Sequence, residues 1–180
     1  MDSDFPTSIG RLGVMALDCP DALALADFYN SIVGGAGADT LEGQDGTDSL
    51  VGGDGNDVYI VDSTDDTIVD VSGTDTVRSS VDFDLSDPNV SGGIENLILT
   101  GNATLGGGNS GTNTITGNSL SNSLDGGTGA DSLIGGLGDD TMVVDDVGDQ
   151  TYEAANEGTD WVLASQSHTL GANIENLSYT

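Results

Sequence analysis

Large apolar residues recur every nine positions between residues 34 and 60. Leu41, Leu50 and Tyr59 each stand eighth in a nine-residue unit that opens with glycines and polar residues. The glycines predict a tight turn, and the residues around each large side chain predict a short strand that points it inward. Two units make one coil of 18 residues with a turn at each edge. The pattern therefore predicts an all-β fold, a parallel β-roll or β-solenoid built of nonapeptide coils.

The stretch that follows the first nonapeptides has a different pattern. Residues 77–85 alternate between the two faces of an extended chain, with Val77, Phe83 and Leu85 on the apolar face. A period of two predicts one half-buried strand over this range. Turn-forming residues follow at 87–89, so we expect a strand-rich spacer rather than a helix.

The N-terminal 33 residues follow neither pattern. Residues 11–17, RLGVMAL, predict a short strand. A short N-terminal helix is predicted by four apolar residues at helical spacing, namely Leu25, Phe28, Tyr29 and Ile32. We interpret this segment as a cap on the first coil or as a fused remnant of another domain.

The nonapeptides occur in two blocks, and each block is followed by a longer segment. GTDTV at 73–77 matches GTDWV at 158–162, and IENLILT at 94–100 matches IENLSYT at 174–180. These copies lie 80 to 85 residues apart, so one module occurs twice and the chain ends within the second copy. The expected organisation is a cap or remnant at 1–33, a first nonapeptide block at 34–62, a spacer at 63–107, a second block at 108–145 and a second, incomplete spacer at 146–180.

The charge of the chain narrows its partner. There are 31 acidic and 2 basic residues, which gives a formal net charge of −29. Nucleic acid and anionic lipid are excluded as partners, because both are recognised through Lys and Arg. No apolar run approaches the ~18 residues of a transmembrane segment, and the acidic N-terminus is unlike a signal peptide. Cys19 is the single cysteine, so no internal disulfide is expected. The natural partner of so many carboxylates is a cation.

The sixth residue of each nine-residue unit is the expected cation ligand. Turns on one edge lie one coil apart, so at the ~4.8 Å spacing of stacked strands their side chains share one gap. The expected pairs are Asp39 with Asp57, Asn113 with Asp131 and Asn122 with Asp140, while Asp48 lies on the opposite edge. Stacked carboxylates repel one another, and a hard dication removes that repulsion. Ca²⁺ takes about 6–8 oxygen ligands in flexible geometry and fits better than Mg²⁺. Zn²⁺ prefers His and Cys, and the chain has one of each.

The first nonapeptide block has few large apolar side chains for its length. Leu41, Leu50 and Tyr59 are its main inward residues, and 27 residues must be ordered around them. An ion that binds only the folded form would tip the balance toward folding. We therefore expect binding and folding to be coupled, with a disordered chain in the absence of Ca²⁺ and a β-roll in its presence.

Four of the nine-residue units carry a family resemblance. GGAGADTLE, GGDGNDVYI, GGTGADSLI and GGLGDDTMV fit the pattern G-G-x-G-x-D-x-U-x, and GQDGTDSLV departs only at Gln44. Residues 34–180 thus resemble the RTX, or haemolysin-type, calcium-binding repeat proteins of bacteria. The resemblance implies Ca²⁺ as the bound ion, a parallel β-roll, an extracellular location and export by a type I secretion apparatus.

The resemblance also implies a ligand set. The carboxylates would be Asp39, Asp48, Asp57, Asp131 and Asp140. The glycines that shape the turns would be Gly35, Gly37, Gly53, Gly55, Gly127, Gly129, Gly136 and Gly138. Asn113 and Asn122 would be neutral substitutes for Asp. Leu120 stands where the turn requires glycine, so residues 117–122 are expected to bind an ion weakly or not at all.

The remaining polar residues are interpreted as structural. Four acidic residues of the spacers are expected to be solvated turn residues: Asp65, Asp66, Asp145 and Asp146. His168 is interpreted as an ordinary strand residue and Trp161 as a packing residue. No group with the spacing of a general acid and base can be identified, so we expect no enzyme activity from this chain.

A second resemblance lies near the N-terminus. Residues 13–34 resemble the first strand and helix of glyoxalase-like domains of the vicinal-oxygen-chelate fold, over about twenty residues. The metal ligands and the rest of such a domain are absent, so no activity is carried over. Two alternatives to a calcium-dependent folding module of a secreted protein stay open: a structural segment of a bacterial surface or adhesin array, and a non-catalytic tail of a secreted enzyme.

Overall fold

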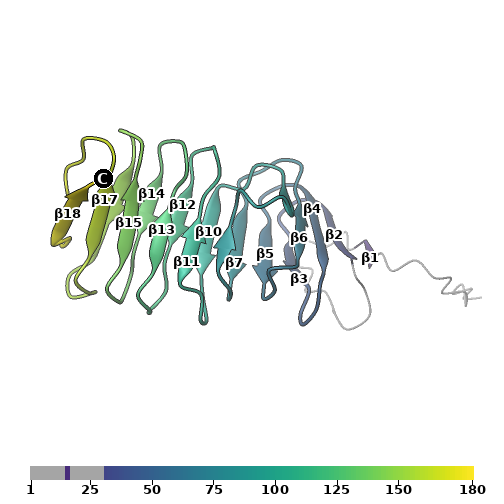
Figure 1. The fold of residues 1–180 in the computed structure, drawn as a ribbon. Helices are drawn as coiled ribbons and strands as arrows, with labels where there is room; N and C mark the ends of the chain where they lie inside the picture. Colours follow the sequence, from purple (N-terminus) through teal and green to yellow (C-terminus); the bar gives the residue numbers. More distant parts are fainter. Residues whose placement is uncertain (1–14, 17–30) are drawn as a thin grey trace, which may run out of the picture.

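The computed structural model describes residues 15–16 and 31–180, which form a stack of flattened coils (Figure 1). The strands make three parallel sheets. Sheet A contains β1 (Met15–Ala16), β2 (Ser31–Ala36), β4 (Ser49–Asp54), β6 (Thr67–Val69) and β9 (Val90–Ser91). Sheet B contains β3 (Thr40–Glu42), β5 (Val58–Val61), β7 (Thr76–Ser79), β10 (Asn96–Leu99), β12 (Thr114–Thr116), β14 (Ser132–Ile134) and β16 (Gln150–Tyr152). Sheet C contains β8 (Phe83–Asp84), β11 (Leu105–Gly107), β13 (Ser123–Asp125), β15 (Thr141–Val144), β17 (Trp161–Ala164) and β18 (Asn176–Tyr179).

The nonapeptide period sets the register between coils. In sheet B, Leu41 pairs with Tyr59, and in sheet A, Ile32 pairs with Leu50, so each step is one 18-residue coil. The step widens in the spacers, where Val77 pairs with Leu97. The prediction of an all-β parallel solenoid is confirmed, and the spacers continue the same stack with longer turns.

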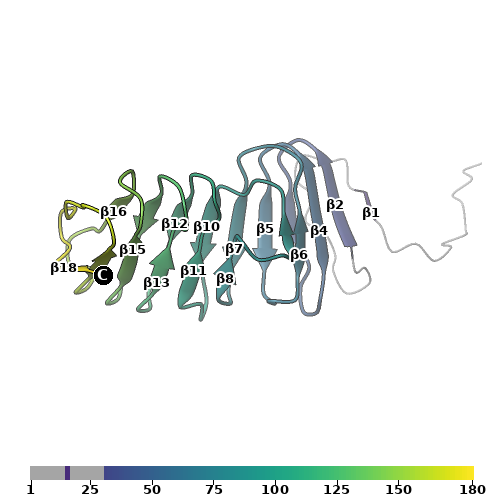
Figure 2. The same cartoon turned by 45° about the horizontal axis from the view of Figure 1, so that its top comes forward.

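Sheet B runs along the whole stack, whereas sheets A and C cover its N-terminal and C-terminal parts. The change occurs in one coil, which contributes β8 to sheet C and β9 to sheet A (Figure 2). The single strand expected over residues 77–85 is therefore wrong. The strand ends at Ser79, whose hydroxyl donates to the Val81 carbonyl at 2.7 Å and accepts from the Val81 amide, and this local turn sends the chain out of sheet B. The alternation at residues 77–85 reflects two short strands on either side of that turn.

One continuous column of apolar side chains fills the inside of the coils. The eighth residue of each nonapeptide lies in it, and the large apolar residues of the spacer strands continue it. Its fully buried members include Leu41, Leu50, Tyr59, Ile68, Leu97, Ile115, Leu124, Leu133 and Met142. The turns at the two edges of the coils are thereby fixed one above another.

The N-terminal predictions are tested only in part. Met15–Ala16 forms β1 within the stretch expected to be a strand and pairs with β2. Ile32 lies in β2 rather than in a helix, because its strand pairs with the next coil. The other three residues of the expected helix, and most of the glyoxalase-like stretch, lie outside the described residues. Residues 15–16 and 31–180 contain no helix, and accordingly none that is long and apolar enough to cross a membrane.

Candidate metal centres

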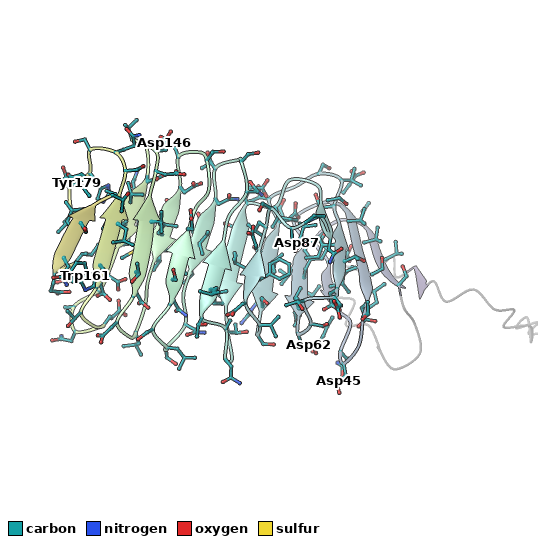
Figure 3. All side chains as sticks on the ribbon, in the orientation of Figure 1. Asp45, Asp62, Asp87, Asp146, Trp161 and Tyr179 are labelled. Carbon is teal, nitrogen blue, oxygen red and sulfur yellow. The ribbon has the colours of Figure 1, made fainter. Side chains whose placement is uncertain are left out.

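Two ladders of acidic and amide side chains run along the stack. Each ladder residue stands directly before a strand, so parallel pairing of the strands stacks these residues coil upon coil. The first ladder, before the strands of sheet B, contains Asp39, Asp57, Asp75, Glu95, Asn113, Asp131 and Asp149. The second contains Asp48 and Asp66 before sheet A, and Asn122, Asp140, Asp160 and Glu175 before sheet C. Figure 3 shows the two edges: Asp146, close to the first ladder, lies opposite Asp45 and Asp62.

One carboxylate oxygen of most ladder residues bonds to the preceding coil. The amide of Asp39 donates to Oδ1 of Asp57 at 2.9 Å, and the amide of Asp57 donates to Oδ1 of Asp75 at 2.7 Å. On the other edge the amide of Asp48 donates to Oδ1 of Asp66 at 3.0 Å. These bonds hold each carboxylate in the gap between two turns, and they leave its second oxygen for another partner.

That second oxygen is buried and has no hydrogen bond at six ladder positions. They are Asp48, Asp57, Asp75, Asp131, Asp140 and Asp160, and each of these side chains is at most 7% exposed. A buried anionic oxygen without a partner is costly, and a hard cation is the partner that this oxygen-only environment fits. The residues present therefore suit Ca²⁺.

The electrostatics of the ladders point the same way. Burial is the main cause that raises the pKa of Asp75, Asp131 and Asp140 to about 6, and neighbouring carboxylates add to it. Burial followed by repulsion from Asp66 raises the pKa of Asp48. A carboxylate whose ionised form is disfavoured by its surroundings is stabilised when a cation binds.

The glycines of the nonapeptide turns have the backbone that their pattern predicts. All eight expected turn glycines have positive φ, between 74° and 139°. The reason for glycine is clearest at Gly53 and Gly55, where an added Cβ would overlap the carbonyl oxygens of Gly35 and Gly37 in the coil before. The absence of side chains thus lets backbone carbonyl oxygens face the same gaps as the carboxylates. Gln44 takes the same conformation, with φ of 65°.

The two turns that carry Asn in place of Asp are built differently. The side-chain amide of Asn113 donates to the Ile94 carbonyl at 2.9 Å, and its Oδ1 accepts the Asn109 amide at 2.8 Å. Asn122 likewise donates to the Ala103 carbonyl at 3.2 Å. An amide N–H meets the carbonyl oxygens of the preceding coil directly in these turns, so these Asn side chains supply a donor where Asp would need a cation.

Several ladder residues were missed from the sequence. Asp66 was expected to be a solvated turn residue, but it is 2% exposed and stacks on Asp48; Asp65 and Asp145 are exposed as expected. Asp75 and Asp149 also continue the ladders beyond the nonapeptides. A signal was available, because Asp66, Asp75 and Asp149 each follow a nonapeptide Asp by 18 residues.

Two other residues differ in detail from their interpretation. His168 lies outside the strands, with its Nε2 3.1 Å from the Thr151 hydroxyl. Trp161 begins β17 and is 45% exposed, so much of its ring faces solvent rather than packing.

The stacked turns agree with the comparison with known families. The model of the RTX calcium-binding nonapeptide repeat matches residues 30–59 and 107–143 in four copies. The chain carries RTX calcium-binding nonapeptide repeats. No curated protein and no solved structure matches it. The RTX repeats identify Ca²⁺ as the ion that the β-roll binds, and the acidic groups between its turns are of a kind that holds a metal ion.

Proposed function

We propose that this chain is a calcium-dependent folding module of a secreted bacterial protein. Its nonapeptide turns bind Ca²⁺ through Asp39, Asp48, Asp57, Asp131 and Asp140, together with carbonyl oxygens of the glycine turns. The single observation that carries the proposal is the buried second oxygen of the nonapeptide Asp residues, which has no hydrogen bond at Asp48, Asp57, Asp131 and Asp140.

The coupling to folding rests on charge and burial together. The chain has a formal net charge of −29, and stacking the coils concentrates its carboxylates along two edges. In the unfolded chain these groups are separated and hydrated, whereas in the β-roll they repel and lose water. Ca²⁺ binds the stacked arrangement and not the separated one, so it stabilises the fold by mass action.

Secretion follows from this dependence. A chain that stays unfolded where calcium is scarce can be exported as an extended polymer, and it folds where calcium is abundant. We propose export of the type I kind, which the RTX repeats support because proteins with such repeats are generally secreted by bacteria.

A calcium titration followed by far-UV circular dichroism tests the proposal. The parent chain is expected to gain β signal cooperatively with Ca²⁺ and not with Mg²⁺ at the same concentration. The variant Asp39→Ala/Asp57→Ala is expected to need more Ca²⁺ for the same change. A matched control is Asp65→Ala/Asp145→Ala, which removes the same charge from two exposed positions.

Two results would contradict the proposal. A chain that is already folded in chelator would show that the ion is not needed for folding. A titration that shifts equally in the ladder variant and in the exposed control would show that net charge, not the gap between turns, governs the response.

A further inference from the structure

Each nonapeptide block is followed by a turn in which a carboxylate replaces the first glycine. Val51 pairs with Val69, so the residue after Val69, Asp70, stacks on Gly52. Ile134 pairs with Tyr152, so Glu153 stacks on Gly135 in the same way. Both acidic residues lie outside the ranges that match the RTX repeat. The pattern of the repeat therefore gives no reason for them.

Asp70 completes a group of three buried carboxylates. One carboxylate oxygen from each of Asp57, Asp70 and Asp75 lies within 4.8 Å of the others. Asp70 is 8% exposed and its Oδ2 has no hydrogen bond. Its Oδ1 accepts the hydroxyl of Tyr59 at 2.8 Å, which holds the side chain toward the inside of the coil. An added Cβ at Gly52 would overlap this hydroxyl, so the glycine makes room for the group.

Glu153 completes a second group of the same form. One oxygen from each of Asp140, Glu153 and Asp160 lies within 4.8 Å of the others. Asp140 and Asp160 are at most 1% exposed, and their Oδ2 atoms have no hydrogen bond. Both carboxylate oxygens of Glu153 are also buried without a partner. A Cβ at Gly135 would overlap Oε1 of Glu153, so again a glycine in the preceding coil gives the carboxylate its space.

The two groups are equivalent positions of the repeated module. Asp57 and Asp140 end the last full nonapeptide turn of their blocks, and Asp75 and Asp160 stand in the matching GTD segments. The amide of Asp75 donates to Glu95, and the amide of Asp160 donates to Glu175, at 2.8 and 2.9 Å. The first group lies before strands of sheet B and the second before strands of sheet C, on opposite edges of the coil. The same chemistry is thus built twice in different surroundings, which argues against chance.

We propose that these triads are two further Ca²⁺ sites, each with three carboxylates, placed where a nonapeptide block joins its spacer. A nonapeptide gap brings two ladder side chains together, whereas each triad adds a third charge from the turn itself. Because calcium affinity in such sites rises with the number of charged ligands, the triads fill before the nonapeptide gaps as calcium rises. The ion then holds the first spacer coil onto the block. The inference rests on the proposed function in that Asp57 and Asp140 serve both kinds of site.

The chain has aromatic reporters beside both triads. Tyr59 bonds to Asp70, and Trp161 follows Asp160 directly at the start of β17 (Figure 3). Tb³⁺, a trivalent ion that takes the oxygen ligands of Ca²⁺, luminesces when a nearby aromatic residue transfers energy to it. Excitation at the red edge selects Trp161 and thus the second triad, and excitation of tyrosine reports the first.

The experiment compares Asp70→Gly and Glu153→Gly with the parent chain. Each substitution restores the first glycine of the nonapeptide pattern and removes only the added carboxylate. Asp70→Asn keeps the size of the side chain and tests its charge alone. Asp65→Asn removes one charge from an exposed position of the same spacer and is the control. Calcium binding is measured by calorimetry and by displacement of Tb³⁺, and folding at saturating calcium by circular dichroism.

The expected result is a selective loss of tight binding. Asp70→Gly and Asp70→Asn each weaken one of the tightest Ca²⁺ ions about tenfold or more, because one of three charged ligands is gone. The tryptophan-sensitised Tb³⁺ signal survives in these variants and is lost in Glu153→Gly. The control binds like the parent.

Other outcomes overturn the inference. If Asp70→Gly binds as many ions as tightly as the parent, or more tightly, the turn prefers its glycine and Asp70 is no ligand. If a variant fails to fold even in saturating calcium while Asp70→Asn binds like the parent, the side chain has a packing role only. A parent chain that shows no calcium response at all contradicts the proposed function instead, which keeps the two failures distinct.

Discussion

The close approach of the coils at Gly53 can be tested by a matched pair of glycine substitutions. Gly35 and Gly53 hold the same position in nonapeptides one coil apart, and their φ values are 117° and 103°. They differ in what lies beside them. A Cβ on Gly53 would overlap the carbonyl oxygen of Gly35, whereas no described atom lies within 4 Å of a Cβ on Gly35. Replacing each by Ala therefore separates backbone strain from the contact between coils.

The strain is common to both variants and the clash is not. A left-handed backbone costs an L-residue about 1–2 kcal/mol, so Gly35→Ala should lose about that much stability. Gly53→Ala must also open the gap between coils, which strains the bond from the Gly37 amide to the Asp54 carbonyl, now 2.6 Å long. A buried backbone group left without its partner costs about 1–3 kcal/mol. Gly53→Ala should therefore lose about 2–5 kcal/mol in total.

Urea denaturation in saturating Ca²⁺, followed by circular dichroism, measures the difference. Gly93→Ala is the control, because Gly93 has no positive φ and the nearest atom to its added Cβ is 3.5 Å away. It should stay within about 0.5 kcal/mol of the parent chain. Equal losses for Gly35→Ala and Gly53→Ala would refute the reasoning, since they would show that φ alone demands glycine and that the coils have room to spare.

Three further predictions concern acidity, the core and the aromatic bond. The pKa of Asp75 in the folded chain is about 6, above the ~3.9 of an unfolded Asp, so the fold binds more protons than the unfolded chain between these values. In chelator the fold should thus be most stable below pH ~4 and lose stability as the pH rises through ~6, which urea midpoints at several pH values measure; a midpoint that rises over that range would contradict it. Leu124→Ala should cost about 2–5 kcal/mol in saturating Ca²⁺, because Leu124 is fully buried, whereas Leu120→Ala, at a 38% exposed position, should change the same urea midpoint little. Tyr59→Phe removes the donor to Asp70 and should cost about 1.5–3 kcal/mol, and a variant as stable as the parent would show that the bond contributes nothing.

The sequence by itself determined the coil and much of its edge chemistry. A nine-residue period with glycines before Asp and one large apolar residue after it leaves few alternatives to stacked turns and short strands. Leu41, Tyr59 and the eight turn glycines accordingly lie where the pattern predicts. This information is local, because turn conformation and side-chain direction depend on neighbours within one unit.

The sequence pattern was less informative where the unit length changes. The alternation at residues 77–85 has the period of one strand, but a bend stabilised by Ser79 divides it between two sheets. A period of two describes which way side chains point and not whether the chain stays in one sheet. The spacers also vary the step between coils, so spacing alone did not place their acidic residues.

Only the tertiary structure decided which of these acidic residues join the ladders. Asp66 stacks on Asp48, and Asp70 turns into the coil beneath the hydroxyl of Tyr59, while Asp65 between them in space and sequence stays exposed. All three are Asp in a polar turn, and composition does not distinguish them. Parallel pairing of strands distant in sequence fixes their height and direction, and glycines in the preceding coil provide the space. Burial of a carboxylate is thus a property of two coils together, which no single stretch of the chain contains.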